Sequence, residues 1–544
     1  MINEPLFQND ILEHIIKYLS YYLGYGNWFI IFCSILLFLY ICYKFLMHNN
    51  NVSYAGNFPK GKFCFSIHEK RDIYALIFLI LCTAYNIFGI IDQEMSFFSN
   101  YDTRGSVIPL FEKGGLPMLG VSERFYPLSF WDTRILYAIT HNFYVINTYV
   151  NVQSVIIVIL LNYFLQYIPI WKRFLCIGLI MISPAVFSIN SIIYSERLLL
   201  MYIIGSFICM KKYSENPNKK FFLWFTILLI NCALYSKESC VLFYSGILAY
   251  FVFGHIWYGR IIPQSFLTPI KTAKKIPFET LLFLSLLFFV LVYGCFMASV
   301  LDSKYVSFMF TSFSYLAKIY CTEIIITLIT LFLLIKALFH KNKYSFLESC
   351  ALGTIIVTAV LIFVLKIAQQ VPSMAYKSYY LIIPNVVGLI YIYSRLKNKY
   401  FIVFLSCAFF AGFTMRDYTI HHREDGFAYR EVADFIMSGK KAAEINVFMS
   451  NHAEPDNWQI KSWFMPYKYY WPDAHIKVFS AKLEEGDFSI LYNKYPIFYK
   501  EKPDIGDLFL IRKGEYYTQD LESISLQTCK KIFENDLFEV YSVQ

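Results

Sequence analysis

The chain has 544 residues, of which 57% are hydrophobic and only 16% are charged. An average soluble chain carries about 25% charged residues and about 45–50% apolar ones. So few charges cannot cover so much apolar surface in water, and the mean hydropathy of +0.47 agrees with this. The composition argues against a soluble enzyme, a secreted disulfide-linked scaffold and a disordered hub, and it favours a membrane-embedded protein.

Apolar runs recur along the chain from residue 28 to residue 415. Each is long enough, or nearly long enough, to cross a hydrocarbon core of about 30 Å as a helix. We therefore predict an α-helical polytopic membrane protein with about twelve transmembrane helices. The runs lie near 28–46, 73–91, 149–168, 174–191, 197–211, 220–236, 240–258, 279–299, 323–339, 346–366, 378–394 and 400–415.

Basic residues mark every second linker between these runs. Positively charged short loops stay in the cytoplasm, so these linkers are expected there. The other side then holds the N-terminus, a large loop at 92–148 and everything after about residue 416. The basic linkers contain Lys44, Lys60, Lys62, Lys70 and Arg71; Lys172 and Arg173; Lys211, Lys212, Lys219 and Lys220; Arg260, Lys271, Lys274 and Lys275; Lys341 and Lys343; and Arg395, Lys397 and Lys399.

The balance of charged residues changes near residue 416. Residues 417–544 carry 15 Lys and Arg against 21 Asp and Glu, whereas residues 1–416 carry 33 against 18. We expect a transmembrane module over 1–416 and a small, soluble, extracytoplasmic α/β domain over 417–544. Its sequence pattern predicts a helix at 428–439 followed by short strands. The strands are expected at 445–449, 476–479, 488–491, 507–512 and 537–543.

Ionisable residues gather at the predicted outer ends of the spans. Such residues are costly at membrane depth and need a reason to be there. Cations on this side oppose the positive-inside bias, which favours an anionic ligand such as phosphate. The alternative is that each is an interfacial cap or a topological anchor. The set includes Asp102, Arg104, Glu123, Arg124, Asp132, Glu196, Arg197, Lys237, Glu238 and Lys377.

Four outer segments follow one another in a suggestive order. The first pairs Phe98-Ser-Asn-Tyr-Asp102-Thr-Arg104-Gly105 with Ser122-Glu-Arg124-Phe-Tyr-Pro127; the others are Tyr194-Ser-Glu196-Arg197, Tyr235-Ser-Lys237-Glu238 and Ala375-Tyr-Lys377-Ser-Tyr-Tyr380. Together they resemble the motifs of GT-C glycosyltransferases, multispan enzymes that take a sugar from a polyprenyl-phosphate carrier. That superfamily often has D-x-D in its first outer loop. This chain has Asn100-Tyr-Asp102 there, so no tightly bound divalent metal is expected.

The resemblance and the chemistry of the reaction suggest a role for each residue. Asp102 is expected to be the catalytic base that deprotonates an acceptor hydroxyl, and one carboxylate acting in a single step inverts the anomeric centre. The donor phosphate is expected to bind Arg124, Lys237 and Lys377. Further donor or acceptor contacts are expected from Glu196, Glu238, Tyr376, Arg104 and Glu123. In the alternative interpretation Asp102 is a turn residue, and Glu196 pairs with its neighbour Arg197.

The predicted function is transfer of a sugar from a polyprenyl-phosphate donor to a hydroxyl of an envelope glycan, such as O-antigen, or of a lipid-linked acceptor. The expected location is the extracytoplasmic face of a bacterial inner membrane, since the Lys-, Asn-, Ile- and Tyr-rich usage is typical of an AT-rich bacterial genome. Expected partners are membrane lipid, the donor, the acceptor, a donor-synthesising glycosyltransferase and a flippase, with no nucleic acid. The alternatives are an O-antigen polymerase or ligase, a lipid-linked glycan flippase or transporter, and a non-catalytic scaffold.

Overall fold

A computed structural model of the chain describes parts of two compact units. One unit comprises Met1–Gly89, Gly114–Thr140 and Thr148–Thr414, and the other comprises Ile90–Lys113, His141–Asn147 and Met415–Gln544. We call them the helical unit and the sheet unit. The described residues are 36–41, 44, 67, 69–88, 128–140, 143–183, 185–186, 189, 195–257, 276–299, 321–339, 346–364, 381–396, 428, 431–438, 445–449, 476–480, 504–513 and 529–544.

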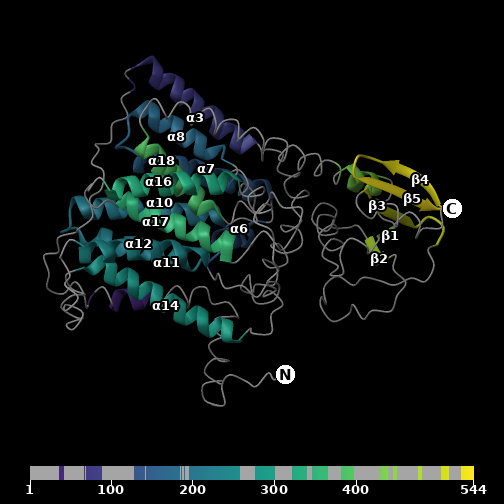
Figure 1. Ribbon diagram of the computed structural model, residues 1–544. Coiled ribbons are helices and arrows are strands. Elements are labelled where there is room, and N and C mark those ends of the chain that lie inside the picture. Colours follow the sequence, from purple (N-terminus) through teal and green to yellow (C-terminus); the bar gives the residue numbers. More distant parts are fainter. Residues whose placement is uncertain are drawn as a thin grey trace, which may run out of the picture. The chain divides into compact units, whose positions relative to one another are not determined.

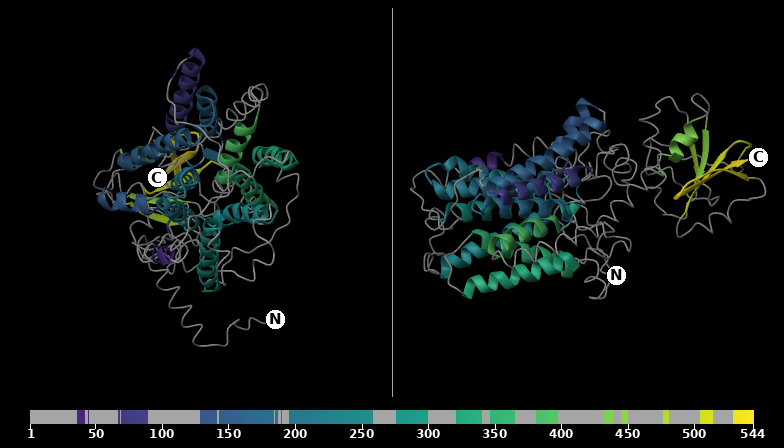
Figure 2. Two further views of the ribbon diagram at one scale, coloured as in Figure 1. Left: turned by 90° about the vertical axis from the view of Figure 1, so that its left-hand side faces the viewer. Right: turned by 90° about the horizontal axis from the view of Figure 1, so that it is seen from above.

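The described part of the helical unit is a bundle of α-helices that lie side by side (Figures 1 and 2). Close neighbours are α3 with α8, α10 with α11, α12 with α17, and α16 and α17 with α18. The helices are α3 (Lys70–Phe88), α6 (Trp131–Ile139), α7 (Phe143–Phe164), α8 (Ile170–Met181), α10 (Glu196–Glu215), α11 (Lys220–Leu234), α12 (Ser239–Trp257), α14 (Pro277–Ser299), α16 (Cys321–Phe339), α17 (Phe346–Ala359), which continues as a π-helical turn over Val360–Val364, and α18 (Ile382–Arg395).

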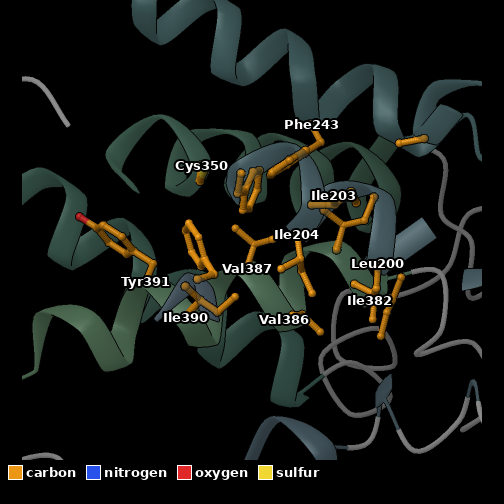
Figure 3. Packing of buried hydrophobic residues seen from close by; sticks show 14 of the residues in the cluster. Leu200, Ile203, Ile204, Phe243, Cys350, Ile382, Val386, Val387, Ile390 and Tyr391 are labelled. Carbon is orange, nitrogen blue, oxygen red and sulfur yellow. The ribbon is translucent and has the colours of Figure 1, made fainter. Parts of the chain in front are cut away.

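The core of the bundle lies where α10, α12, α17 and α18 meet (Figure 3). On α10, Leu200, Ile203 and Ile204 recur at helical spacing and are buried. This spacing places them on one face of the helix, toward its neighbours. The facing residues are Phe243 of α12, Cys350 of α17, and Ile382, Val386, Val387, Ile390 and Tyr391 of α18.

The prediction of about twelve membrane-spanning helices is wrong for this structure. Among the described residues, only α14 is long and apolar enough to cross a membrane by length and composition, over Pro277–Gly294. Several of the other apolar runs form shorter helices. At 1.5 Å per residue, the 14 residues of α18 reach only about 21 Å.

Burial within the protein explains much of this difference. In α18, twelve of 14 residues are buried, and in α8 nine of 12 are, including Lys172 and Arg173. A helix that packs against protein on all sides consists of apolar residues, and so does a helix that faces lipid. Hydropathy along the sequence does not distinguish the two cases.

The sheet unit contains a five-stranded mixed sheet with strand order β2-β1-β3-β5-β4. β1 is parallel to both β2 and β3, whereas β5 is antiparallel to β3 and β4. A helical segment at 431–437 packs on β4 through Phe435, whose ring stacks on Phe533 at 4.6 Å. The strands are β1 (Ile445–Met449), β2 (Ile476–Ser480), β3 (Leu508–Arg512), β4 (Cys529–Glu534) and β5 (Phe538–Val543).

Four of these strands lie where the sequence pattern predicts them. β4 was not predicted, and the predicted strand at 488–491 lies outside the described residues. Burial explains the missing prediction: β5 is buried along almost its whole length, whereas most of β4 is exposed. β4 also contains Lys530 and Lys531, and its pairing with β5 is irregular between Lys531 and Phe533. Apolar and polar residues therefore do not alternate regularly along β4.

Candidate functional site

One end of the helical unit holds a cluster of buried and half-buried polar side chains, which we call the polar cluster. It comprises Ser129, Asp132, Tyr149, Gln153, Ser195, Glu196, Arg197, Ser236 and Lys237. These residues come from the start of α6, the first turns of α7, the start of α10 and the turn between α11 and α12. Segments far apart in the sequence therefore meet at one place.

Hydrogen bonds hold these segments together. The Leu128 amide donates to the Tyr235 carbonyl at 3.0 Å, and the Ser129 hydroxyl donates to the Ser236 carbonyl at 2.7 Å. The Ser195 hydroxyl lies 3.3 Å from that of Ser129. The turn before α6 is thereby fixed against both the start of α10 and the turn before α12.

The central interaction is an ion pair between Glu196 and Lys237, in which the Lys237 ammonium donates to Glu196 Oε1. Both side chains are buried. Glu196 is the first residue of α10, where the helix dipole favours a carboxylate. Two of the residues singled out from the sequence are thus brought into direct contact.

A second set of polar contacts surrounds Asp132, in the first turn of α6. Its Oδ2 accepts hydrogen bonds from the Tyr149 hydroxyl at 3.0 Å and from the Gln153 amide at 2.5 Å. Gln153 in turn accepts a hydrogen bond from Arg197 Nε at 3.2 Å, and Arg197 Nη1 donates to the Ile189 carbonyl. The carboxylate of Asp132 and the guanidinium of Arg197 are therefore linked through one amide.

The two carboxylates differ in their surroundings. Glu196 is buried and is neutralised by a lysine. Asp132 is only half-buried and receives its hydrogen bonds at Oδ2 from neutral donors. Of the two, Asp132 is better placed to receive a proton from a hydroxyl that approaches the site.

The structure brings together only part of the predicted site. Glu196 and Lys237 meet, and the half-buried Glu238 follows them in the turn before α12. The alternative pairing of Glu196 with Arg197 is wrong, because Glu196 pairs with Lys237 while Arg197 is held by Gln153. The remaining predicted site residues, Asp102, Arg104, Glu123, Arg124, Tyr376 and Lys377, lie outside the described residues.

Asp132 and Arg197 belong to the ionisable set of the predicted outer face, but the sequence gives neither an individual role in the site, and it does not select Gln153. Gln153 carried a usable signal, because an uncharged polar residue inside an apolar helix needs a hydrogen-bond partner. Asp132 stands next to Trp131, whose indole donates to the Tyr202 hydroxyl at 2.8 Å and so fixes α6 on α10. The pairing itself depends on the packing of α6, α7 and α10.

Lys237 does not present an uncompensated charge, because Glu196 already neutralises it. To bind a donor phosphate, Lys237 would have to exchange or share that partner. A metal site is a separate question: within the described residues, no group of three or more His, Cys, Asp or Glu side chains is arranged to hold a metal ion.

Comparisons with known proteins do not assign the chain to a family. No protein-family description matches the sequence, and no curated protein matches it either.

Proposed function

We propose that this protein is a membrane-bound glycosyltransferase that uses a polyprenyl-phosphate sugar as donor. In this proposal it modifies an envelope glycan or a lipid-linked acceptor at the extracytoplasmic face of a bacterial inner membrane. The donor and the acceptor are its partners, and the chain needs no tightly bound metal. One observation carries the proposal: two segments that resemble GT-C motifs, around Glu196 and Lys237, meet in a buried ion pair, and Arg197 next to this pair is linked through Gln153 to Asp132.

The reaction assigns a role to each group. The acceptor hydroxyl attacks the anomeric carbon of the donor while a carboxylate takes the hydroxyl proton. The bond from that carbon to the phosphate oxygen breaks, and polyprenyl phosphate leaves. We propose Asp102 as the base. The geometry of the described residues adds Asp132 as a second candidate for this role. Arg124 and Lys377 are proposed to bind the phosphate.

The Glu196–Lys237 pair is proposed to fix the outer turns that carry the substrate contacts. Burying two charges costs free energy that their attraction only partly offsets. This pair lies where the turn before α6, the start of α10 and the turn before α12 meet, which supports a role in positioning these segments. Glu196 and Glu238 then contact sugar hydroxyls, as Arg104, Glu123 and Tyr376 are proposed to do.

Exposed apolar side chains support placement in a membrane. A monomer in water rarely exposes a large contiguous apolar patch. On α16, Leu328 and Phe332 are 58% and 66% exposed, and on α14, Val290 and Leu291 are 51% and 59% exposed. Leu328 and Phe332 are four residues apart, and on α14 the exposed Leu287 precedes Leu291 by four, so each helix presents an apolar stripe. Lipid tails would cover such stripes.

The proposal is tested by a transfer assay on the purified protein with a panel of radiolabelled polyprenyl-phosphate sugars and lipid-linked acceptors. Wild type is compared with Asp102→Asn and Asp132→Asn, and Lys219→Met serves as a control because Lys219 is exposed and outside the polar cluster. Loss of a general base reduces the rate by about 10²–10⁴-fold.

The outcomes separate the parts of the proposal. Transfer that collapses in Asp102→Asn but not in Lys219→Met supports Asp102 as the base. Collapse in Asp132→Asn alone moves the base to α6 and keeps the reaction. Absence of transfer by wild type across the donor panel, from protein that is folded by circular dichroism, contradicts the proposed function.

A further inference from the structure

The end of α10 opposite the polar cluster gathers basic side chains. Lys211 lies 15 residues after Glu196, which is about 22 Å along the helix axis. The last turns of α7 and α18 and the start of α8 contribute to the same region. In the described part of the chain, the cations here are Lys172, Arg173, Lys211, Lys212 and Arg395; Lys212 pairs with Glu215 and Arg395 with Glu348.

Ordinary partners account for three of these cations. Lys172 donates to the Leu396 carbonyl at 2.7 Å, beyond the end of α18. Lys212 pairs with Glu215 at 3.5 Å, and Arg395 pairs with Glu348. Basic residues near helix C-termini often satisfy carbonyl groups and interact favourably with the helix dipole. No ligand is needed to explain these contacts.

Lys211 is different. It is only 2% exposed, and its ammonium has no hydrogen-bond acceptor among the residues that the structure describes. The ammonium lies 5.9 Å from the centre of the Tyr167 ring, while the Tyr167 hydroxyl is 2.9 Å from that of Ser394. An ammonium buried without an acceptor is costly. A ligand that supplies the acceptor would remove this cost.

We infer that Lys211 is the centre of a binding site for a phosphate group. Among the described residues, the two carboxylates paired with cations of this group, Glu215 and Glu348, bind Lys212 and Arg395, and neither pairs with Lys211. A phosphate oxygen would give the Lys211 ammonium a charge-assisted hydrogen bond, and Lys212 would add to the attraction. The phosphate can belong to an anionic phospholipid or be free in solution, and basic pockets between helices are known to bind lipid head groups.

Thermal unfolding of the full-length protein tests this site. The protein is held in maltoside micelles, which carry no phosphate, and its unfolding temperature is followed as phosphatidylglycerol, diacylglycerol or inorganic phosphate is added. A ligand that binds only the folded state raises this temperature. The variants are Lys211→Met, Lys211→Arg and Lys219→Met, the last being a matched control from the exposed linker after α10.

We expect phosphatidylglycerol to stabilise wild type, Lys211→Arg and Lys219→Met, and diacylglycerol to have no effect. In Lys211→Met, half-saturation should need about tenfold more ligand, since a hydrogen bond to a charged group is lost. Without phosphate, Lys211→Met should unfold at the same temperature as wild type or higher. The Lys211 ammonium has no hydrogen-bond acceptor among the described residues, so its removal leaves none of them unsatisfied. A similar response to inorganic phosphate alone would make the free ion the ligand, whereas a response to phosphatidylglycerol only would make it the lipid.

Three results would overturn the inference. The first is an unchanged response of Lys211→Met. The second is an equal loss in Lys219→Met, which would indicate general attraction to positive charge. The third is a Lys211→Met protein that is less stable than wild type, or unfolded, in phosphate-free micelles, which would make Lys211 a structural residue. Sugar transfer plays no part in these measurements, so they do not depend on the proposed function.

Discussion

The Glu196–Lys237 pair is a buried ion pair within the polar cluster, and this makes each partner depend on the other. We predict that Lys237→Met lowers the free energy of unfolding by about 3–5 kcal/mol, because the Glu196 carboxylate is left buried without its cation. The double variant Glu196→Gln with Lys237→Met should recover much of this loss. Denaturant unfolding in micelles measures both. A double variant as unstable as the single one would count against the pairing.

Acid should weaken the β4–β5 hairpin of the sheet unit. Hydrogen bonds from the Lys513 and Lys531 ammonium groups lower the pKa of the Glu534 carboxyl from 4.5 to about 2. The pKa is lower in the folded state than in the unfolded state, so this stabilisation is present above about pH 4.5 and is lost as the pH falls toward 2.

Hydrogen-exchange protection factors of the β4 and β5 amides at about pH 6 and about pH 3 measure this effect. Protection should fall more in wild type than in Glu534→Gln, which lacks the titrating group. Asp536→Asn removes an exposed carboxyl from the same hairpin and should behave as wild type does. An equal fall in wild type and Glu534→Gln would contradict the assignment.

At the residue scale, the sequence predicts which side chains lie at helix ends but not which of them pair. Glu196 and Lys237 were both placed at the outer ends of helices, and they do meet. The suggested pairing of Glu196 with Arg197 fails for a geometric reason: adjacent residues on a helix point about 100° apart, whereas partners on one face are three or four residues apart. Arg197 therefore reaches Gln153 on another helix.

Among the elements, α12 and α17 approach each other closely through two glycines. A Cβ atom on Gly353 would lie 2.6 Å from the Phe243 carbonyl oxygen, and one on Gly246 would lie 2.5 Å from Gly353 Cα. Both contacts are with backbone, which cannot move aside as a side chain can. We predict that Gly353→Ala lowers the free energy of unfolding by about 1–3 kcal/mol.

A matched substitution in α14 provides the control for this prediction. Gly294 is exposed, and a Cβ added there would have no neighbour within 4 Å among the described atoms. Gly294→Ala should therefore stabilise its helix by about 0.5–1 kcal/mol. Thermal unfolding of the two variants side by side checks the difference. If both change the stability in the same direction, the close crossing of α12 and α17 is not the cause.

Element boundaries show what the sequence can and cannot predict. β1 occupies Ile445–Met449 as predicted, because four of its five residues are apolar and polar residues flank it. Helix length was less predictable: α8 ends at Met181, although the apolar run continues to residue 191. The sequence has Ser183-Pro184 just after this helix, and a proline disfavours helical backbone at the residue before it, a signal that hydropathy does not register.

For the whole molecule, we predict that the protein stays with membranes after extraction with alkaline carbonate. The helix α14 is the candidate span among the described residues, and its exposed stripe includes Val290 and Leu291. Replacing both with Asp should release a large fraction of the chain, since an acidic residue at the centre of a span costs about 2.5–3.5 kcal/mol.

Fractionation of cells that express wild type, the double variant and Gly294→Ala checks this prediction. Gly294→Ala changes a neighbouring exposed position without adding charge and should remain in the membrane pellet. Release of the wild-type protein into the carbonate supernatant would exclude an integral membrane location.

The strand order of the sheet unit has a consequence for how this unit folds. β5 lies between β3 and β4, yet it follows both of them in the chain. Until β5 has joined the sheet, β3 therefore has one open edge and β4 lacks its antiparallel neighbour. Open strand edges readily pair with other chains. A folding intermediate that has formed β1, β2 and β3 but not β5 is thus the state most exposed to aggregation, and a holding chaperone would be most useful at that stage.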